Sequence, residues 1–131
     1  MKITEQIKTF EDACKVLGLD PAQVDQFPNT QNDLLKGILA FTKLLIIAEA
    51  LNEGYQPDWN NSNEYKYQPW FDMRSKKVGS GLGLSFHAFG YDSSFSIVGS
   101  RLVYRSSELA QYAWDQFPEI YADAFVKNRA Q

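Results

Sequence analysis

The feature that most constrains this fold is a long helix whose apolar surface is too wide for one neighbour to cover. Thr30 and Asp33 have the spacing of a helix-capping pair, and Gly54 is a stop signal at the other end. Between them, apolar side chains recur at helical spacing on one broad face: Leu34, Ile38, Phe41, Leu44, Leu45, Ile47, Ala48 and Leu51. The pattern predicts a central helix that contacts other elements on several sides.

Two shorter helices are predicted before the central one. Thr9 and Asp12 form another capping pair, and Gly18 can close that helix in a left-handed conformation. Asp20 and Pro21 then provide an N-cap and a proline at the first helical position. The second short helix is expected to reach residue 26.

The periodicity changes to that of β-strands after residue 55. The clearest alternation places Leu84, Phe86 and Ala88 on one face, with His87 on the other. A strand limited by Pro69 is predicted before it, residues 76–81 predict a turn, and residues 101–105 resume an extended structure. Residues 64–105 are therefore expected to form a three-stranded antiparallel meander.

A final helix is predicted from residue 107 to residue 127. Its apolar residues recur at helical spacing, and Ser106 or Ser107 is suited to cap it. Pro118 lies inside this segment and should kink or break it, because proline lacks an amide donor. We expect one α+β domain spanning residues 1–131, with helices in 9–53, the meander in 64–105 and the last helix packed on one sheet face.

The overall charge does not favour a polyanionic partner. The chain has a formal net charge of −3, but residues 55–105 hold six Lys or Arg against four acidic residues. A weakly basic region is therefore embedded in an acidic protein, which gives no long-range field to attract nucleic acid or an anionic membrane.

Cysteine content and hydropathy indicate the cell compartment. Cys14 is the single cysteine, so no internal disulfide can form. The N-terminus lacks the features of a signal peptide, and the most apolar run, residues 38–48, is shorter than the roughly 20 residues that span a bilayer. We expect a cytoplasmic protein without a membrane partner, either a monomer or a homodimer.

Residues 55–71 are the richest candidate for a binding site, with six aromatic side chains among amides and carboxylates. Such rings stack on bases, sugars or peptide side chains, and the amides supply hydrogen bonds. The structural alternative is that the rings seal the edge of a small core while Asn and Asp shape turns. With nearby basic residues, the predicted contact surface comprises Trp59, Asn61, Tyr65, Tyr67, Trp70, Lys76, Lys77, His87 and Arg101.

His87 is the one histidine and therefore the one candidate for acid/base chemistry near neutral pH. Catalysis would require a reacting partner and an orienting carboxylate, for which Asp58, Glu64, Asp72 and Asp92 are all possible; the enzyme hypothesis places His87 with Ser85 and Asp92. No spacing singles out such a set, and no cluster of metal ligands is evident. We therefore expect no catalytic residue, no metal site and no cofactor.

Four parts of the sequence carry a resemblance to known proteins: residues 9–13 with Leu17 and Gly18, then 57–67, then Trp70 and Phe71, and finally 98–102. Together they resemble a family of small proteins carried by phages and integrated elements of Bacteroides-type gut bacteria. The resemblance covers most of the chain. Because no activity is established for that family, it implies a genetic setting and no catalytic residues.

The leading functional hypothesis is a non-enzymatic binding or accessory protein of a phage or mobile element, with a protein partner. It would use the aromatic segment and the adjacent meander as its contact surface. The second hypothesis is a single-strand nucleic-acid binder that stacks bases on Tyr and Trp rings. The third is a small enzyme centred on His87.

Overall fold

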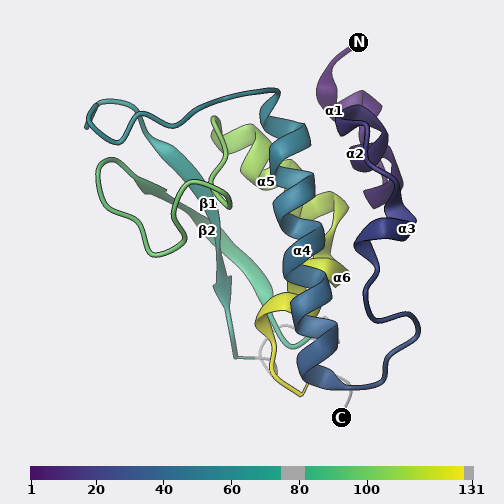
Figure 1. Cartoon of the computed structure of the whole chain (residues 1–131). Helices are drawn as coiled ribbons and strands as arrows, with labels where there is room; N and C mark the ends of the chain where they lie inside the picture. The colour runs from purple at the N-terminus through teal and green to yellow at the C-terminus, as the bar shows by residue number, and fades with distance from the viewer. Residues whose placement is uncertain (75–81, 129–131) are drawn as a thin grey trace.

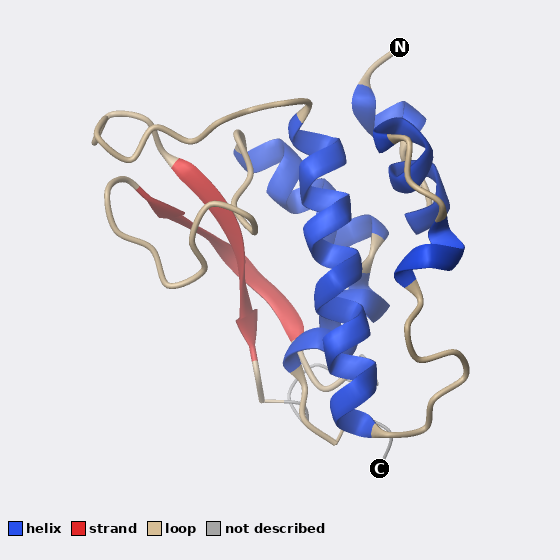
Figure 2. Cartoon of the chain, in the orientation of Figure 1, coloured by secondary structure: helices blue, strands red, loops and turns tan. Residues whose placement is uncertain are grey.

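The computed structural model describes residues 1–74 and 82–128 and shows a mixed α+β fold (Figures 1 and 2). The elements follow in the order α1 (Ile3–Gln6), α2 (Phe10–Leu17), α3 (Pro21–Val24), α4 (Asp33–Asn52), β1 (Lys66–Asp72), β2 (Ser85–Asp92), α5 (Ser107–Gln116) and α6 (Pro118–Phe125). Helix α4 runs through the middle, with α1–α3 on one side and the sheet on the other (Figure 1). Helices α5 and α6 complete the helical layer against which the sheet packs.

The predicted caps of the N-terminal helices are confirmed. The Thr9 hydroxyl accepts from the backbone N–H of Asp12, and the Asp12 carboxylate accepts from that of Thr9, both at 3.1 Å. Gly18 ends α2 with φ 71°, and Asp20 caps α3, which ends at Val24 rather than at residue 26. Cys14 is buried in α2, and burial raises the pKa of its thiol, so it has no thiolate character at neutral pH.

Helix α4 begins two residues later than the Thr30 and Asp33 pair predicts. Asn32 is the N-cap, because its side-chain oxygen accepts from the N–H of Leu35 at 3.1 Å. The Thr30 hydroxyl instead accepts from the N–H of Asn32, in a turn before the helix. The helix ends at Asn52, and Glu53 and Gly54 both have positive φ.

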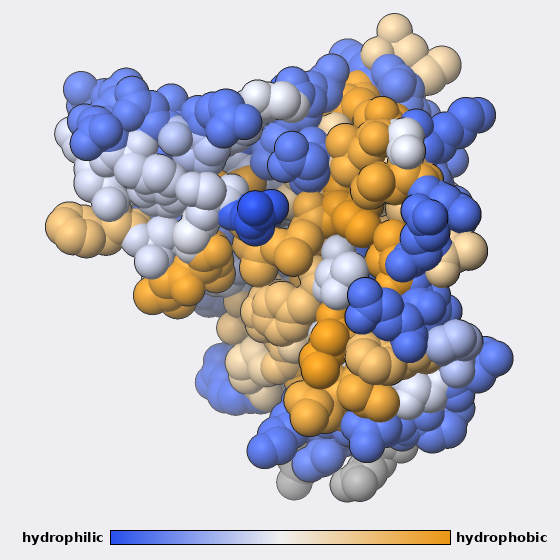
Figure 3. Space-filling model, in the orientation of Figure 1, coloured by the Kyte–Doolittle hydropathy of each residue, from blue (hydrophilic) through white to orange (hydrophobic). Residues whose placement is uncertain are grey.

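Only the C-terminal half of α4 is enclosed as its apolar pattern predicts. Leu44, Ile47 and Leu51 have no exposed surface, because α2, α5 and α6 pack around them. Leu34, near the N-terminal end, is 70% exposed, and Ile38 is 44% exposed. An apolar band is visible over α4 in Figure 3.

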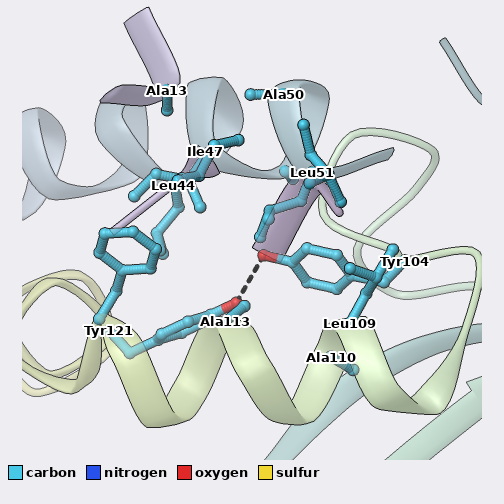
Figure 4. Packing of buried hydrophobic residues seen from close by; sticks show 14 residues of the cluster. Ala13, Leu44, Ile47, Ala50, Leu51, Tyr104, Leu109, Ala110, Ala113 and Tyr121 are labelled. Atoms are coloured by element: carbon cyan, nitrogen blue, oxygen red, sulfur yellow. Dashed lines mark hydrogen bonds between the residues drawn. The ribbon is translucent and has the colours of Figure 1, made fainter. Parts of the chain in front are cut away.

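The core contains a pair of tyrosines whose hydroxyl groups meet between the helices (Figure 4). Tyr104 and Tyr121 are buried, and their hydroxyl oxygens lie 2.9 Å apart. Leu44 and Leu51 of α4 and Leu109 of α5 belong to the same apolar cluster. The hydrogen bond satisfies two polar groups that would otherwise be costly to bury.

The sheet of the described residues has two antiparallel strands, so the prediction of a three-stranded meander is wrong. Tyr67 pairs with Tyr91 of β2 near one end of the ladder, and Trp70 pairs with Ala88. The pairing then shifts by one residue, because Phe71 is opposite Phe86, which makes His87 the extra residue of a β-bulge.

The predicted third strand, residues 101–105, contributes a single bridge, and it pairs with β1 instead of β2. Tyr104 exchanges two backbone hydrogen bonds with Tyr67, of 2.9 and 2.7 Å. The neighbouring backbone groups are taken by Asn52, whose side-chain amide donates to the carbonyl of Val103 and accepts from the N–H of Arg105. A side chain at the end of α4 thus replaces the ladder that a strand would form.

The predicted C-terminal helix is broken at Pro118. Helix α5 ends at Gln116, Phe117 adopts a non-helical conformation, and Pro118 occupies the first turn of α6. Proline is favourable there because its missing N–H has no helical partner to lose. Phe71 of β1 packs against both helices, with ring centroids 5.2 Å from Trp114 and 5.4 Å from Tyr121.

Candidate functional site

The loop between α4 and β1 is organised around Lys66, the first residue of β1. The Lys66 side chain has no exposed surface. Its ammonium donates to the carbonyl oxygens of Asp58 and Asn61 at 2.6 and 3.2 Å. A third hydrogen bond, of 2.6 Å, goes to the carbonyl of Ser93, in the loop after β2. Three bonds use every donor of the ammonium, so Lys66 ties two loops together and is not available to a ligand.

Trp59 faces inward and strengthens the same junction. Its ring centroid lies 5.1 Å from the Lys66 ammonium, and its indole N–H donates to the hydroxyl of Ser100 at 2.7 Å. Asn61 contributes its carbonyl to Lys66, and its side chain accepts from the N–H of Asn63. The structure gives Trp59 and Asn61 roles in holding the loops, while partner binding by them stays a prediction.

Glu64 stabilises the interior of the loop before β1. Its carboxylate accepts from the backbone N–H of Asp58 at 2.9 Å and from the hydroxyl of Tyr55 at 2.7 Å. These hydrogen bonds hold the pKa of Glu64 below its ordinary value, and the bond from the Asp58 N–H has the largest effect. The loop is therefore pinned by its own polar side chains.

Residues 93–100, which we call the serine loop, are fixed at several points but present two large apolar side chains to solvent. Ser93 is bound by Lys66, Ser100 is bound by Trp59, and the Ser96 hydroxyl accepts from the second and third N–H groups after it at 3.1 and 3.0 Å. Phe95 is 88% exposed and Ile97 is 94% exposed. Apolar atoms project in Figure 3 on the side where this loop lies in Figure 1.

A group of aromatic side chains is partly exposed at the end of the sheet where Tyr67 pairs with Tyr91. The rings of Tyr65 and Tyr91 stack with centroids 4.5 Å apart, and both are exposed. Tyr67 and Phe89 meet edge to face at 6.2 Å. Of these four, the sequence singled out the two that lie in or next to β1, Tyr65 and Tyr67.

Trp70 lies over the backbone of Gly90 and is 57% exposed. A Cβ atom at Gly90 would lie 2.2 Å from the indole nitrogen of Trp70, so the ring fills the place of the missing side chain. The indole therefore rests on the sheet while more than half of its surface stays accessible. This is the geometry of a stacking platform.

Replacing Gly90 with alanine should displace this ring. We expect Gly90→Ala to increase quenching of tryptophan fluorescence by iodide and to destabilise the fold by about 1 kcal/mol. In a Trp70→Ala background, Gly90→Ala should not lower the free energy of unfolding, because alanine is more favourable than glycine in a strand. An equal cost in both backgrounds would show that Trp70 does not rest on Gly90.

A hollow of about 370 Å³ lies beside Trp70 at the edge of β1, and we call it the edge hollow. It is lined by β1 and the residue after it, by one residue of β2, by the serine loop and by α6: Gln68, Pro69, Trp70, Phe71, Met73, His87, Ile97, Val98 and Phe125. Gln68 is 7% exposed, and its side-chain oxygen has no hydrogen-bond partner in the described part of the chain. A buried amide oxygen without a partner is uncommon and costly.

No protein-family model, curated protein or solved structure matches this chain. The function of the site must therefore be inferred from its own residues. Within residues 1–74 and 82–128, no group of three His, Cys, Asp or Glu side chains could hold a metal ion. None of the helices in those residues has both the length and the apolar character to cross a membrane.

His87 is exposed and reaches the edge hollow from the β-bulge. Ser85 is two residues away on the same strand, but Asp92 is at the far end, paired with Lys66. Five residues of strand correspond to about 16 Å. The structure therefore does not bring Asp92 to His87, and no described carboxylate lines the hollow beside the imidazole.

Most of the basic residues described between positions 55 and 105 are already engaged. These residues are Lys66, Arg74, Arg101 and Arg105. Lys66 is buried, and Arg74 pairs with Asp72 at 2.9 Å. Arg105 pairs with Glu53 at 2.7 Å, whereas Arg101 is exposed. The predicted contact residues Lys76 and Lys77, and the predicted turn at 76–81, lie outside the described residues.

Proposed function

We propose that this chain is a non-enzymatic protein-binding module whose contact surface is centred on the serine loop. The observation that supports this is the exposure of Phe95 and Ile97 on a loop held by Lys66, Trp59 and Ser96. Large apolar side chains that project together from a fixed segment are typical of interaction surfaces.

The energetics favour a partner that covers both side chains. Burying a Phe or an Ile side chain contributes about 1.5 to 3 kcal/mol each. Because the loop is already fixed by hydrogen bonds, binding would lose little conformational entropy. Trp70, which is also exposed and lines the same hollow as Ile97, would extend this surface along the sheet.

The nucleic-acid alternative has weaker support, because stacking proteins also need cations along the phosphate backbone. Three of the four described basic residues near the aromatic surface are buried or paired with carboxylates. A mobility-shift titration at low salt tests this alternative, and a shift at micromolar protein would favour it. The proposed setting, a phage or mobile element, is supported by the family resemblance alone.

The proposed function predicts that the double substitution Phe95→Ser with Ile97→Ser abolishes partner capture without unfolding the protein. The wild type and the variant would be used for affinity capture from nuclease-treated lysate of cells that express the chain. Leu34→Ser is the matched control, since Leu34 is 70% exposed on the opposite part of the molecule. Proteins captured equally by all three forms would contradict the proposal.

A further inference from the structure

One edge of β1 stops being paired after Tyr67, the second residue of the strand. Tyr67 exchanges both of its backbone hydrogen bonds with Tyr104, so its N–H and C=O point away from β2. Alternate residues of a strand share this direction, so Pro69 and Phe71 also present their backbone groups on this edge. Among the described residues no strand continues the pairing beyond Tyr104.

The edge hollow lies along this same stretch of β1. Pro69 and Phe71 line it from the strand, Ile97 lines it from the serine loop, and Phe125 lines it from α6. The hollow therefore extends the contact surface that Ile97 and Trp70 begin. Its volume of about 370 Å³ is at the lower end of the range for ligand sites, which suits one or two side chains.

The chemistry of the lining selects an uncharged ligand. Seven of the nine lining residues are apolar or aromatic, and the other two are Gln68 and His87. None of the nine is a carboxylate, Lys or Arg, so a charged group would lose its hydration without gaining a partner. An extended apolar peptide fits this environment.

Gln68 supplies an observation that points to a ligand independently of the apolar lining. It is 7% exposed, lines the hollow, and has a side-chain oxygen with no hydrogen-bond partner among the residues that the structure describes. Rotating the amide of Gln68 by half a revolution about its Cγ–Cδ bond exchanges the oxygen and the nitrogen, so either atom can face a ligand. A peptide group, with one donor and one acceptor, complements such an amide.

We infer that the β1 edge binds an extended, uncharged apolar peptide segment of a partner protein by strand addition. The peptide continues the pairing where Tyr104 ends, with backbone bonds to Phe71 and to the carbonyl of Pro69. One of its side chains enters the edge hollow, and one of its peptide groups bonds the Gln68 amide. This inference rests on the proposed function and names the class of partner.

The test is an NMR titration of the ¹⁵N-labelled full chain with a capped seven-residue peptide of alternating valine and threonine. Two further probes are the same peptide N-methylated at alternate residues and a peptide with glutamate in place of valine. We expect saturable shifts of the Phe71 amide, the Gln68 side-chain amide and the Trp70 indole. N-methylation removes the peptide N–H groups that would donate to the carbonyls of Pro69 and Phe71, so it should weaken binding at least tenfold, and glutamate in place of valine should weaken it about tenfold.

Gln68→Met separates a ligand-binding amide from a merely buried one. We expect it to weaken peptide binding about tenfold while leaving the rest of the spectrum unchanged. Gln26→Met, at an exposed position after α3, is the matched control and should bind as the wild type does. If Gln68→Met fails to fold, loss of binding on N-methylation still supports the inference.

Three results would overturn the inference: no saturable shift with millimolar peptide, shifts that avoid β1, or binding insensitive to N-methylation. Ile97 lines the edge hollow but Phe95 does not, so failure of Phe95→Ser alone to reduce protein capture would count against the proposed function and not against strand addition. If capture depends on those two residues and the peptides do not bind at the edge, only the strand-addition inference fails.

Discussion

Replacing Lys66 with methionine is expected to lower the free energy of unfolding by about 3 kcal/mol. Methionine has a similar length but no donor, so the carbonyl oxygens of Asp58, Asn61 and Ser93 lose their shared partner. Each group left unsatisfied in a buried place costs about 1 to 3 kcal/mol, and part of that cost is recovered as the loops open to water. This is a large fraction of the stability of a small domain.

The measurement is urea unfolding followed by circular dichroism. Arg74→Met is the control, because the Arg74 guanidinium is largely exposed and its pair with Asp72 contributes little. Because Lys66 also positions the serine loop, the Lys66→Met variant should lose partner capture as well. A Lys66→Met protein as stable as Arg74→Met would show that the ammonium does not hold the two loops.

Helix starts were predictable where the capping residues act locally. Thr9, Asp12 and Asp20 satisfy backbone groups within three residues, so their sequence spacing is sufficient to place α2 and α3. The start of α4 was placed too early because Thr30 and Asn32 both resemble caps. In the structure the Asn32 side chain accepts from the N–H of Leu35, whereas the Thr30 hydroxyl accepts from the N–H of Asn32.

The number of strands was not predictable, because the decisive residue is far away in the sequence. Asn52 lies 51 residues before Val103 and 53 before Arg105, and its amide occupies their backbone groups. The extended pattern of residues 101–105 is compatible with a strand or with such a bridge. Only the position of the end of α4 distinguishes them.

The sequence predicted several of the residues at the candidate site but not the direction in which their side chains point. Trp59 and Trp70 are equivalent in the sequence pattern, yet Lys66 draws Trp59 inward and the glycine at position 90 lets Trp70 lie on the sheet surface. Phe95 and Ile97 were missed as contact residues. Their alternation with serines between two glycines was the available signal, but it indicates a strand equally well.

The fold should lose stability steeply above pH 10, because Tyr104 and Tyr121 are buried together. Burial raises the pKa of Tyr104 to about 12, and burial with the neighbouring Tyr104 raises that of Tyr121 well above its ordinary value of 10. Below pH 10 both tyrosines keep their protons in the folded and unfolded states, so they add no pH dependence. Above it the unfolded chain loses these protons first, and each tyrosine then lowers stability by about 1.4 kcal/mol per pH unit.

For Tyr104 this loss of stability is complete near pH 12 and amounts to about 3 kcal/mol. Tyr121 lowers stability with a similar slope per pH unit. Urea unfolding at steps between about pH 9 and 12 measures it. Tyr104→Phe with Tyr121→Phe removes both hydroxyl groups, so its stability at neutral pH should change little and its alkaline slope should become shallow. Tyr55, whose pKa burial also raises, leaves a residual slope. The control is Tyr65→Phe with Tyr91→Phe, at exposed positions, which should keep the wild-type slope. A wild-type slope in the Tyr104→Phe, Tyr121→Phe variant would show that these two tyrosines do not cause the alkaline loss of stability.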